Sequence, residues 1–163
     1  MGNIEELKDC KIISNILNKA FLTFAQEFGF TKDNAPNHLA FINSDGVEAF
    51  LNNGLKMYGY KIDSKIIGCA GYSYCGDQIY QIERLATLPE HRNKGVGKKL
   101  MRFLENVIKN NGGKVIEIRV TDSNFTLREW YKNLGFKEIN IEEVNIPGIA
   151  KVPFKACVMK KKI

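Results

Sequence analysis

The chain has 163 residues, of which 44% are hydrophobic and 26% charged, a composition that matches one globular domain over residues 1–163. No window reaches the roughly 18 apolar residues of a membrane span, and the amino terminus has no apolar leader run, so we predict a cytoplasmic protein. The net charge of +6 favours an anionic partner, which leaves nucleic acid, a membrane surface or a phosphorylated small molecule.

Cysteine and histidine usage excludes two further classes. The four cysteines are scattered without a C-x-x-C pair, and the two histidines lie apart from them and from each other. This spacing fits neither a disulfide framework nor a zinc site, so we predict no metal.

A long amphipathic helix is predicted near the amino terminus. Apolar residues recur at helical spacing from Ile12 to Phe28, and Gly29 is suited to end the helix. We recognise no strand before it. The next segment, residues 31–53, contains a proline and a glycine as breakers. It predicts one or two short helices in a loop-rich region, without a recognisable substrate signature.

Alternating apolar residues then predict three strands. Residues 56–62 and 65–74 form a hairpin that turns at residues 63–64, and residues 78–87 form the third strand. Regular alternation along the third strand places one set of side chains on a common face: Gln81, Glu83, Leu85 and Thr87.

A second long helix and a further strand follow. Residues 96–108 carry an apolar stripe opposite a charged face, and the helix stops in the Asn-Asn-Gly-Gly run at residues 110–113. Residues 114–120 alternate again and predict a strand.

The remaining sequence predicts one helix and two strands. Asp122 or Ser123 can cap the helix, and Gly135 closes it as a left-handed residue. Residues 136–144 and 151–159 supply the strands. This order of elements predicts an α/β or α+β fold in which helices cover a central sheet.

The turn between the third strand and the second long helix has the composition of an anion site. The first N–H groups of a helix lack internal partners, and the helix dipole adds partial positive charge. Gly95 and Gly97 leave the backbone open to a phosphate, and Asn93 tolerates positive φ. Three neighbouring side chains add positive charge: Arg92, Lys94 and Lys98. The turn is therefore suited to a diphosphate.

Two common phosphate motifs do not fit these residues. A P-loop requires Ser or Thr after its Gly-Lys pair, but Lys99 follows Lys98, and a dinucleotide fingerprint requires a third glycine where Leu100 stands. The motif that remains is R-x-x-G-x-G, from Arg92 to Gly97, which has low specificity by itself.

A second motif, N-x6-Y-x3-G-F, runs from Asn124 through Tyr131 to Gly135 and Phe136. Together with the run ERLATLPEHRNKGVGKKL, it resembles the GNAT superfamily of acetyl-coenzyme A-dependent N-acetyltransferases, over about residues 56–159. The resemblance implies a GNAT-like central sheet, mixed and mostly antiparallel, flanked by helices.

The resemblance also implies where acetyl-coenzyme A binds. The diphosphate would lie on the glycine turn, and the pantetheine arm would pair with the edge of the preceding strand. Asn124 can also serve as a helix cap. The implied contacts are Leu85, Ala86, Thr87, Arg92, Asn93, Lys94, Gly95, Val96, Gly97, Lys98, Asn124 and Tyr131.

Acetyl transfer to an amine needs a proton acceptor and a proton donor. An alkylamine, with a pKa of about 10.4 like lysine, is mostly protonated at neutral pH, and the departing thiolate needs a proton. The resemblance makes Tyr131 the candidate acid, with a core aromatic as the alternative role. Glu83 shares its predicted face with Leu85 and Thr87 and is the candidate base, with pairing to Arg84 as the alternative.

We therefore expect an acyltransferase that acetylates a primary amine on a small molecule or a protein. No recognition motif supports a nucleic-acid partner, no membrane partner is expected, and the choice between a monomer and a homodimer stays open. Two alternatives belong to other classes. One is a coenzyme A-binding regulator without turnover, which would not need Glu83 or Tyr131. The other is a basic nucleic-acid binder, whose affinity would depend steeply on salt.

Overall fold

One sheet organises the part of the chain that the computed structural model describes, residues 2–144 and 154–163. Its seven strands lie in the order β1-β2-β3-β4-β5-β7-β6. In chain order the elements are β1 (Asn3–Leu7), α1 (Cys10–Phe28), α2 (Ser44–Asn52), β2 (Lys56–Ile62), β3 (Lys65–Gly76), β4 (Ile79–Thr87), the short 3-10 helix η1 (Pro89–His91), α3 (Val96–Asn110), β5 (Val115–Thr121), α4 (Phe125–Asn133), β6 (Lys137–Val144) and β7 (Phe154–Lys162).

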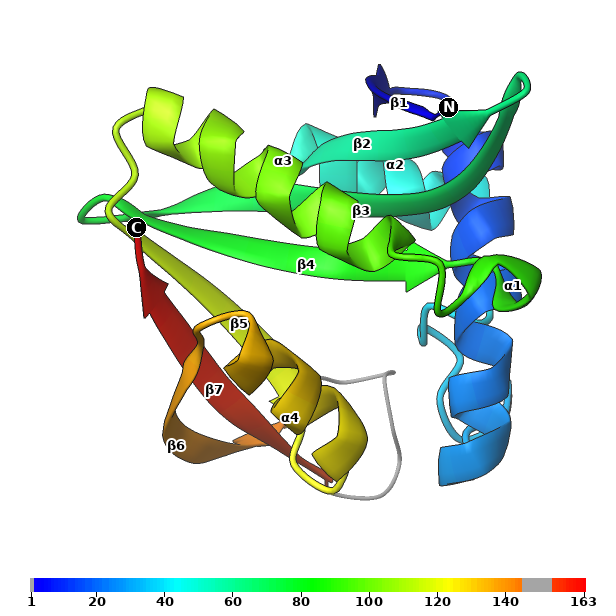
Figure 1. Ribbon diagram of the computed structural model, residues 1–163. Helices are drawn as coiled ribbons and strands as arrows, with labels where there is room; N and C mark the ends of the chain where they lie inside the picture. Colours follow the sequence, from blue (N-terminus) through cyan, green and yellow to red (C-terminus); the bar gives the residue numbers. More distant parts are fainter. Residues whose placement is uncertain (1, 145–153) are drawn as a thin grey trace.

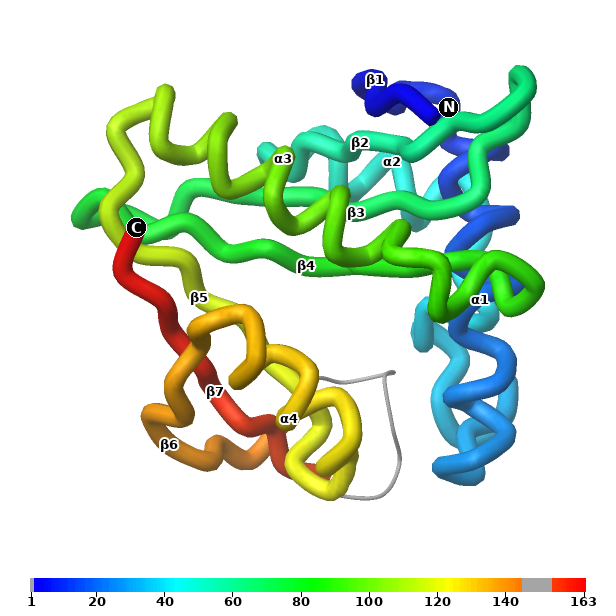
Figure 2. Tube along the Cα trace, in the orientation of Figure 1, coloured from blue at the N-terminus to red at the C-terminus, as the bar shows by residue number. Residues whose placement is uncertain are grey.

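The sheet is mixed, because β4 and β5 run parallel while the other described pairs are antiparallel. β4 and β5 pair only over Ile79–Gln81 and Val115–Glu117, and then they separate (Figure 1). β7, the last strand in the chain, lies between β5 and β6 (Figure 2). From Ile82 to Thr87, the β4 edge that faces β5 has no strand partner in the described part of the chain.

Helices cover both faces of this sheet. α3 packs on one face, where Val96 and Leu100 approach Gly68 of β3, and α1 with α2 covers the other face (Figure 1). The mixed, mostly antiparallel sheet flanked by helices is therefore confirmed. Its core contains the most deeply buried large side chains, among them Ile13, Leu17, Met57, Ile67, Leu100, Leu104, Ile108, Ile116, Ile118 and Met159.

The first helix begins and ends at local signals. Asp9 Oδ1 accepts hydrogen bonds from the backbone N–H groups of Lys11 and Ile12, at 2.9 and 3.1 Å. Gly29 ends the helix with a φ of 73°, a conformation that glycine adopts without steric cost. The predicted helix and its stop are confirmed, and the helix starts slightly earlier than predicted, at Cys10.

A strand precedes α1, although the sequence showed no sign of it. β1 pairs antiparallel with β2 and forms one edge of the sheet. Within β1 only Leu7 is fully buried, and Glu5 and Glu6 interrupt the apolar alternation. An edge strand that buries so little leaves a weak pattern in the sequence, which is why we did not predict it.

β4 contains a bulge, which the sequence also did not reveal. Glu83 pairs with Gly71, and Ala86 pairs with Cys69, so three steps along β4 match two steps along β3. Side chains two apart on β3 share a face, and their partners Glu83 and Ala86 therefore share a face as well.

The bulge overturns the predicted common face of Glu83, Leu85 and Thr87. Arg84, inside the bulge, has a φ of 57°, and Thr87 ends on the α3 side of the sheet while Glu83 lies on the α1 and α2 side. Leu85 also reaches the α3 side, because its Cδ2 lies 3.9 Å from the position of a Cβ added at Gly97. Regular alternation does not hold across an extra residue, so this part of the prediction is wrong.

The last helix starts later than predicted. Its cap is Asn124, whose Oδ1 accepts a hydrogen bond from the Leu127 N–H at 3.2 Å, rather than Asp122 or Ser123. Gly135 follows the helix with a φ of 96°, as predicted for the residue that closes it.

The other predicted elements are confirmed with small shifts. The β2–β3 hairpin turns at Asp63 and Ser64, whose φ angles are 47° and 66°. The 31–53 segment forms one helix, α2, after a loop. The beginning of the last predicted strand, residues 151–153, lies outside the described residues. Among the helices described, none has the length and apolar content to cross a bilayer.

Candidate active site

The glycine turn presents an open helix terminus. Gly95 caps α3 with a φ of 78° and without a side-chain hydrogen bond, and Asn93 has a φ of 62°. The Lys99 N–H donates to the Gly95 carbonyl at 3.0 Å. The N–H groups before it, from Val96 to Lys98, have no acceptor within residues 2–144 and 154–163. This terminus therefore has the free donors that bind a phosphate group.

Space around the two glycines agrees with that role. A Cβ atom added at Gly95 would have no heavy atom within 4 Å. One added at Gly97 would meet Trp130 of α4 at 3.6 Å and Leu85 of β4 at 3.9 Å, which are ordinary contacts. The turn thus lies where β4, α3 and α4 meet, and the space over Gly95 is free of described protein atoms.

The basic side chains at the turn differ in what they contact. Arg92 donates from Nη2 to the Ala20 carbonyl of α1 at 2.6 Å, so it ties the turn to the neighbouring helix. Lys94 donates from Nζ to the Glu90 carbonyl at 3.0 Å. Lys98 is exposed and has no hydrogen bond or ion pair in the described part of the chain. Of the three predicted cations, Lys98 is the most available to an anion.

Because of its contact with α1, Arg92→Met is expected to lower stability as well as coenzyme affinity. A hydrogen bond from a charged donor is typically worth about 1.5–3 kcal/mol. Thr23 Oγ1 also donates to the Ala20 carbonyl, at 3.3 Å, so we expect the low end of that range or less. A loss of about 1 kcal/mol lowers Tm by roughly 2–4 °C in a chain of this size. Thermal unfolding measures this change in Tm, with Arg102→Met on the exposed side of α3 as the control. Equal Tm values in the two variants would contradict a stabilising contact between Arg92 and Ala20.

The unpaired edge of β4 lies beside the turn. Ala86 and Thr87 pair with Cys69 and Gly68 of β3, so their strand is held on that side only. The opposite edge of β4, which faces β5, has no partner strand at Leu85, Ala86 or Thr87 among the described residues. Such an edge can pair with an extended amide-containing arm, which is the shape of pantetheine.

Tyr131 lies in α4 with its ring in the core. The residue is 7% exposed, and its ring meets Trp130 and Phe136 edge to face at centroid distances of 4.9 and 5.6 Å. Burial raises the pKa of Tyr131 above its ordinary value, because a buried phenolate would lose its hydration. The hydroxyl therefore stays protonated at neutral pH, as a proton donor must. The same packing is also what a purely structural core aromatic residue would show, so the alternative role stays open.

Glu83 and Arg84 form an ion pair at the bulge. The Arg84 guanidinium lies over the Phe50 ring of α2, 3.7 Å from its centroid, and Nε is buried without an acceptor among the described residues. Desolvation lowers the pKa of Arg84, and the Glu83 carboxylate opposes that shift. The alternative role of Glu83, as the partner of Arg84, is therefore present in the structure.

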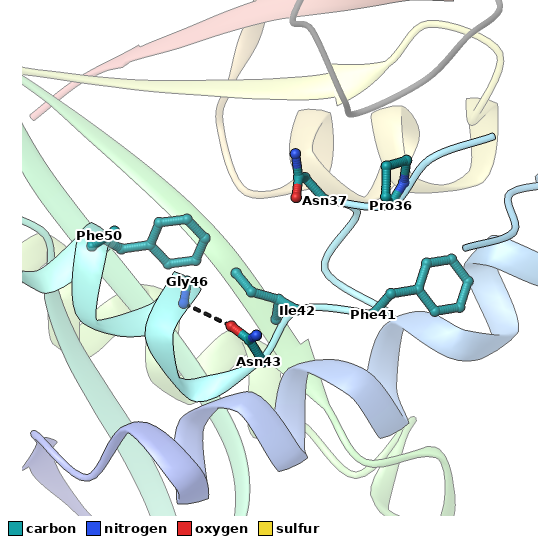
Figure 3. A pocket seen from close by; sticks show the side chains of 8 residues that line it. Pro36, Asn37, Phe41, Ile42, Asn43, Gly46 and Phe50 are labelled. Atoms are coloured by element: carbon teal, nitrogen blue, oxygen red, sulfur yellow. Dashed lines mark hydrogen bonds between the residues drawn. The ribbon is translucent and has the colours of Figure 1, made fainter. Parts of the chain in front are cut away.

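A hollow that shares Phe50 with this cluster, which we call the α2 hollow, is formed by α2 and the loop before it (Figure 3). Its volume is about 240 Å³. It falls within the 31–53 segment, where sequence analysis found no substrate signature, because apolar residues in a loop do not reveal a concave surface. The residues that line it are Pro36, Asn37, Phe41, Ile42, Asn43, Gly46, Ala49 and Phe50.

The fold and this site together define an α/β protein with an open helix terminus at Gly95 and, beside it, a β4 edge that has no strand partner among the described residues. Residues 13–136 match the Acetyltransferase (GNAT) family, and the chain belongs to this family. The resemblance stated from the glycine turn and the Asn-Tyr-Gly-Phe motif is confirmed. The family uses acetyl-coenzyme A.

Individual relatives are distant. The chain is 32% identical over 78 residues to an uncharacterized N-acetyltransferase of Chlorobaculum tepidum, covering 48% of this chain and 47% of that protein. It is 27% identical over 107 residues to the streptothricin acetyltransferase of Streptomyces lavendulae, covering 65% and 57%. The matched segments thus span about half the length of these curated relatives.

A solved structure shows the same fold. The PaiA N-acetyltransferase of Thermoplasma acidophilum, in complex with coenzyme A, matches with a TM-score of 0.73 and 18% identity. The match covers 100% of this chain and 99% of that one. At this identity the likeness concerns the fold.

Proposed function

We propose that the chain is an N-acetyltransferase that moves the acetyl group of acetyl-coenzyme A to a primary amine of a small molecule or a protein. The observation that carries the proposal is the open α3 terminus at Gly95, next to the unpaired edge of β4, in a chain of this family. Both features fit the coenzyme, since free N–H groups suit its diphosphate and a free strand edge suits its arm.

The chemistry assigned to the side chains follows from the charges that form during transfer. The coenzyme supplies a thioester whose carbonyl carbon the neutral amine attacks, and the tetrahedral intermediate then expels a thiolate. Before the attack, Glu83 takes a proton from the ammonium form of the acceptor, directly or through water, and so makes the neutral amine. Tyr131 gives a proton to the departing sulfur, and its raised pKa keeps the hydroxyl protonated until that step. The coenzyme contacts of Lys98 and Asn124 belong to the same proposal.

An amine panel assayed for free thiol release tests this function. We expect acetyl-coenzyme A to bind and at least one primary amine to release thiol at a rate above hydrolysis. Tight binding with no release for any small-molecule or peptide amine would contradict an enzyme and favour a coenzyme A-binding regulator.

We also propose a reducing compartment such as the cytoplasm. Cys10, Cys69, Cys75 and Cys157 are all free thiols, and disulfides persist mainly in oxidising compartments. Fractionation of cells with an antibody against the chain would test it.

Glu83→Gln is expected to lower kcat/KM by about 10²-fold at pH 7, the low end of what acid–base catalysis contributes. Gln keeps the size of the side chain and removes the proton acceptor. Activity should recover as the pH approaches about 10, where the amine loses its proton to solvent.

Arg84→Met provides the control for the ion pair. It removes the Arg84 contact to Glu83 and keeps apolar contact with the Phe50 ring. If Glu83 is the base, only Glu83→Gln should recover activity at high pH. If Glu83 serves only to pair with Arg84, both variants should lose activity equally, without recovery at high pH.

A further inference from the structure

The α2 hollow has an uncharged lining. Five of its eight lining residues carry apolar side chains, and the polar ones are two asparagines. The Oδ1 atom of Asn43 is already engaged, because it accepts a hydrogen bond from the Gly46 N–H at 2.9 Å (Figure 3). The hollow therefore offers mainly apolar contact, and the uncharged amides of Asn37 and Asn43 are its side-chain groups for hydrogen bonds.

Phe50 connects the hollow to the proposed reaction centre. One part of its side chain lines the hollow, and its ring lies under the Arg84 guanidinium, which pairs with Glu83. A group in the hollow is thus separated from the candidate base by two side chains in contact. This proximity makes the hollow a site for part of the acceptor.

The lining of the hollow offers no anion to a second ammonium group. No carboxylate lines it among the described residues, although the exposed residues Asp45 and Glu48 adjoin its lining residues in α2. The Arg84 guanidinium contacts its Phe50 wall. Behind Phe41 lies the His38 ring, at a centroid distance of 6.2 Å, where the Ala40 N–H donates to His38 Nδ1 at 3.1 Å. Burial lowers the pKa of His38, so this ring is neutral at pH 7. His38 supports the wall and does not line the hollow.

We propose that the α2 hollow binds an uncharged, apolar substituent of the acceptor amine, about the size of a phenyl ring or a branched alkyl group. The inference rests on the proposed acetyltransferase function and names its acceptor class. The volume of about 240 Å³ lies below the roughly 300–1,000 Å³ of pockets that hold a whole drug-sized ligand, so the hollow takes one group of the acceptor. A second ammonium there would lose part of its hydration without gaining an anionic partner in the lining, which disfavours diamines and polyamines.

The test compares kcat/KM for 2-phenylethylamine, ethylamine and 1,4-diaminobutane. Burial of the phenyl group in the hollow should stabilise the bound amine. We therefore expect kcat/KM for 2-phenylethylamine to exceed that for each of the other two amines by at least about tenfold. Ala49→Leu places a larger side chain in the hollow from an exposed helical position. It should lower the ratio of kcat/KM for 2-phenylethylamine to that for ethylamine by about tenfold. Asn52→Leu, at the end of the same helix and outside the lining, is the matched control.

Asn37→Asp gives an independent variant, because it adds a charge to the lining at an exposed loop position without changing size. It should shift preference from 2-phenylethylamine toward 1,4-diaminobutane. Two results would overturn the inference and leave the acetyltransferase function intact. One is a kcat/KM for 1,4-diaminobutane that matches or exceeds that for 2-phenylethylamine. The other is an Ala49→Leu variant in which kcat/KM falls equally for both monoamines. Coenzyme binding without turnover of any amine overturns the proposed function, and the inference with it.

Discussion

Gly97→Glu is expected to weaken acetyl-coenzyme A binding by about 10³-fold while the domain stays folded. A side chain fits at this position, because an added Cβ would lie 3.6 Å from Trp130. A carboxylate in the first turn of a helix is favourable to the helix dipole, and Glu has a higher helix propensity than Gly. Against a bound diphosphate, a like charge about 4 Å away costs about 4 kcal/mol at an effective dielectric constant near 20. The variant therefore separates binding from folding.

Gly97→Gln is the control, since it has the size of Glu without the charge. Calorimetry gives the affinity, and thermal unfolding shows that each variant is folded. We expect Gly97→Gln to bind more tightly than Gly97→Glu, and the gap between them should shrink as salt screens the charges. Wild-type affinity for acetyl-coenzyme A in a folded Gly97→Glu variant would show that the diphosphate does not bind at this turn. Gly95 is a poorer position for this test, because its φ of 78° makes any side chain strained there.

The glycine turn was predictable because its determinants are local. Positive φ at Asn93 and Gly95 and a helix that starts at Val96 are all encoded within a few residues. The same holds for α1, which Asp9 caps and Gly29 ends. Features set by neighbours in sequence can be recognised from sequence.

The geometry around Glu83 was not predictable, because it depends on the pairing of β4 with β3. Only the register of that pair reveals the bulge at Arg84 and moves Glu83 to the face of α1 and α2. A backbone in the left-handed region at a non-glycine residue is a form of strain that occurs often at functional sites. At the bulge it brings the Arg84 guanidinium over the ring of Phe50, a residue far away in the sequence.

The displacement of Glu83 changes the interpretation of the site without removing it. On the α1 and α2 side, Glu83 faces the helices that form the α2 hollow, whereas Leu85 and the glycine turn lie on the α3 side. The proposed base thus lies on the side of the α2 hollow, and the proposed coenzyme contacts Leu85, Thr87 and the glycine turn lie on the other side. This division suits a transfer reaction, in which two substrates must reach one point from different directions.

Tyr131→Phe is expected to lower kcat by about 10²–10⁴-fold while acetyl-coenzyme A affinity stays close to wild type. Phe keeps the edge-to-face contacts with Trp130 and Phe136 and removes only the hydroxyl, so the core should remain packed. Tyr74→Phe, on an exposed tyrosine of β3, is the matched control and should keep the wild-type rate.

The alkaline side of the pH profile tests the same hydroxyl in the wild-type chain. An acid catalyst loses activity as the pH rises through its pKa, and burial raises the pKa of Tyr131 above the ordinary value of about 10. The wild-type rate should therefore not fall between pH 8 and about 10, where an ordinary tyrosine would be losing its proton. A Tyr131→Phe variant with the wild-type kcat across this range would leave Tyr131 as a core aromatic, and the departing thiolate would then take its proton from water.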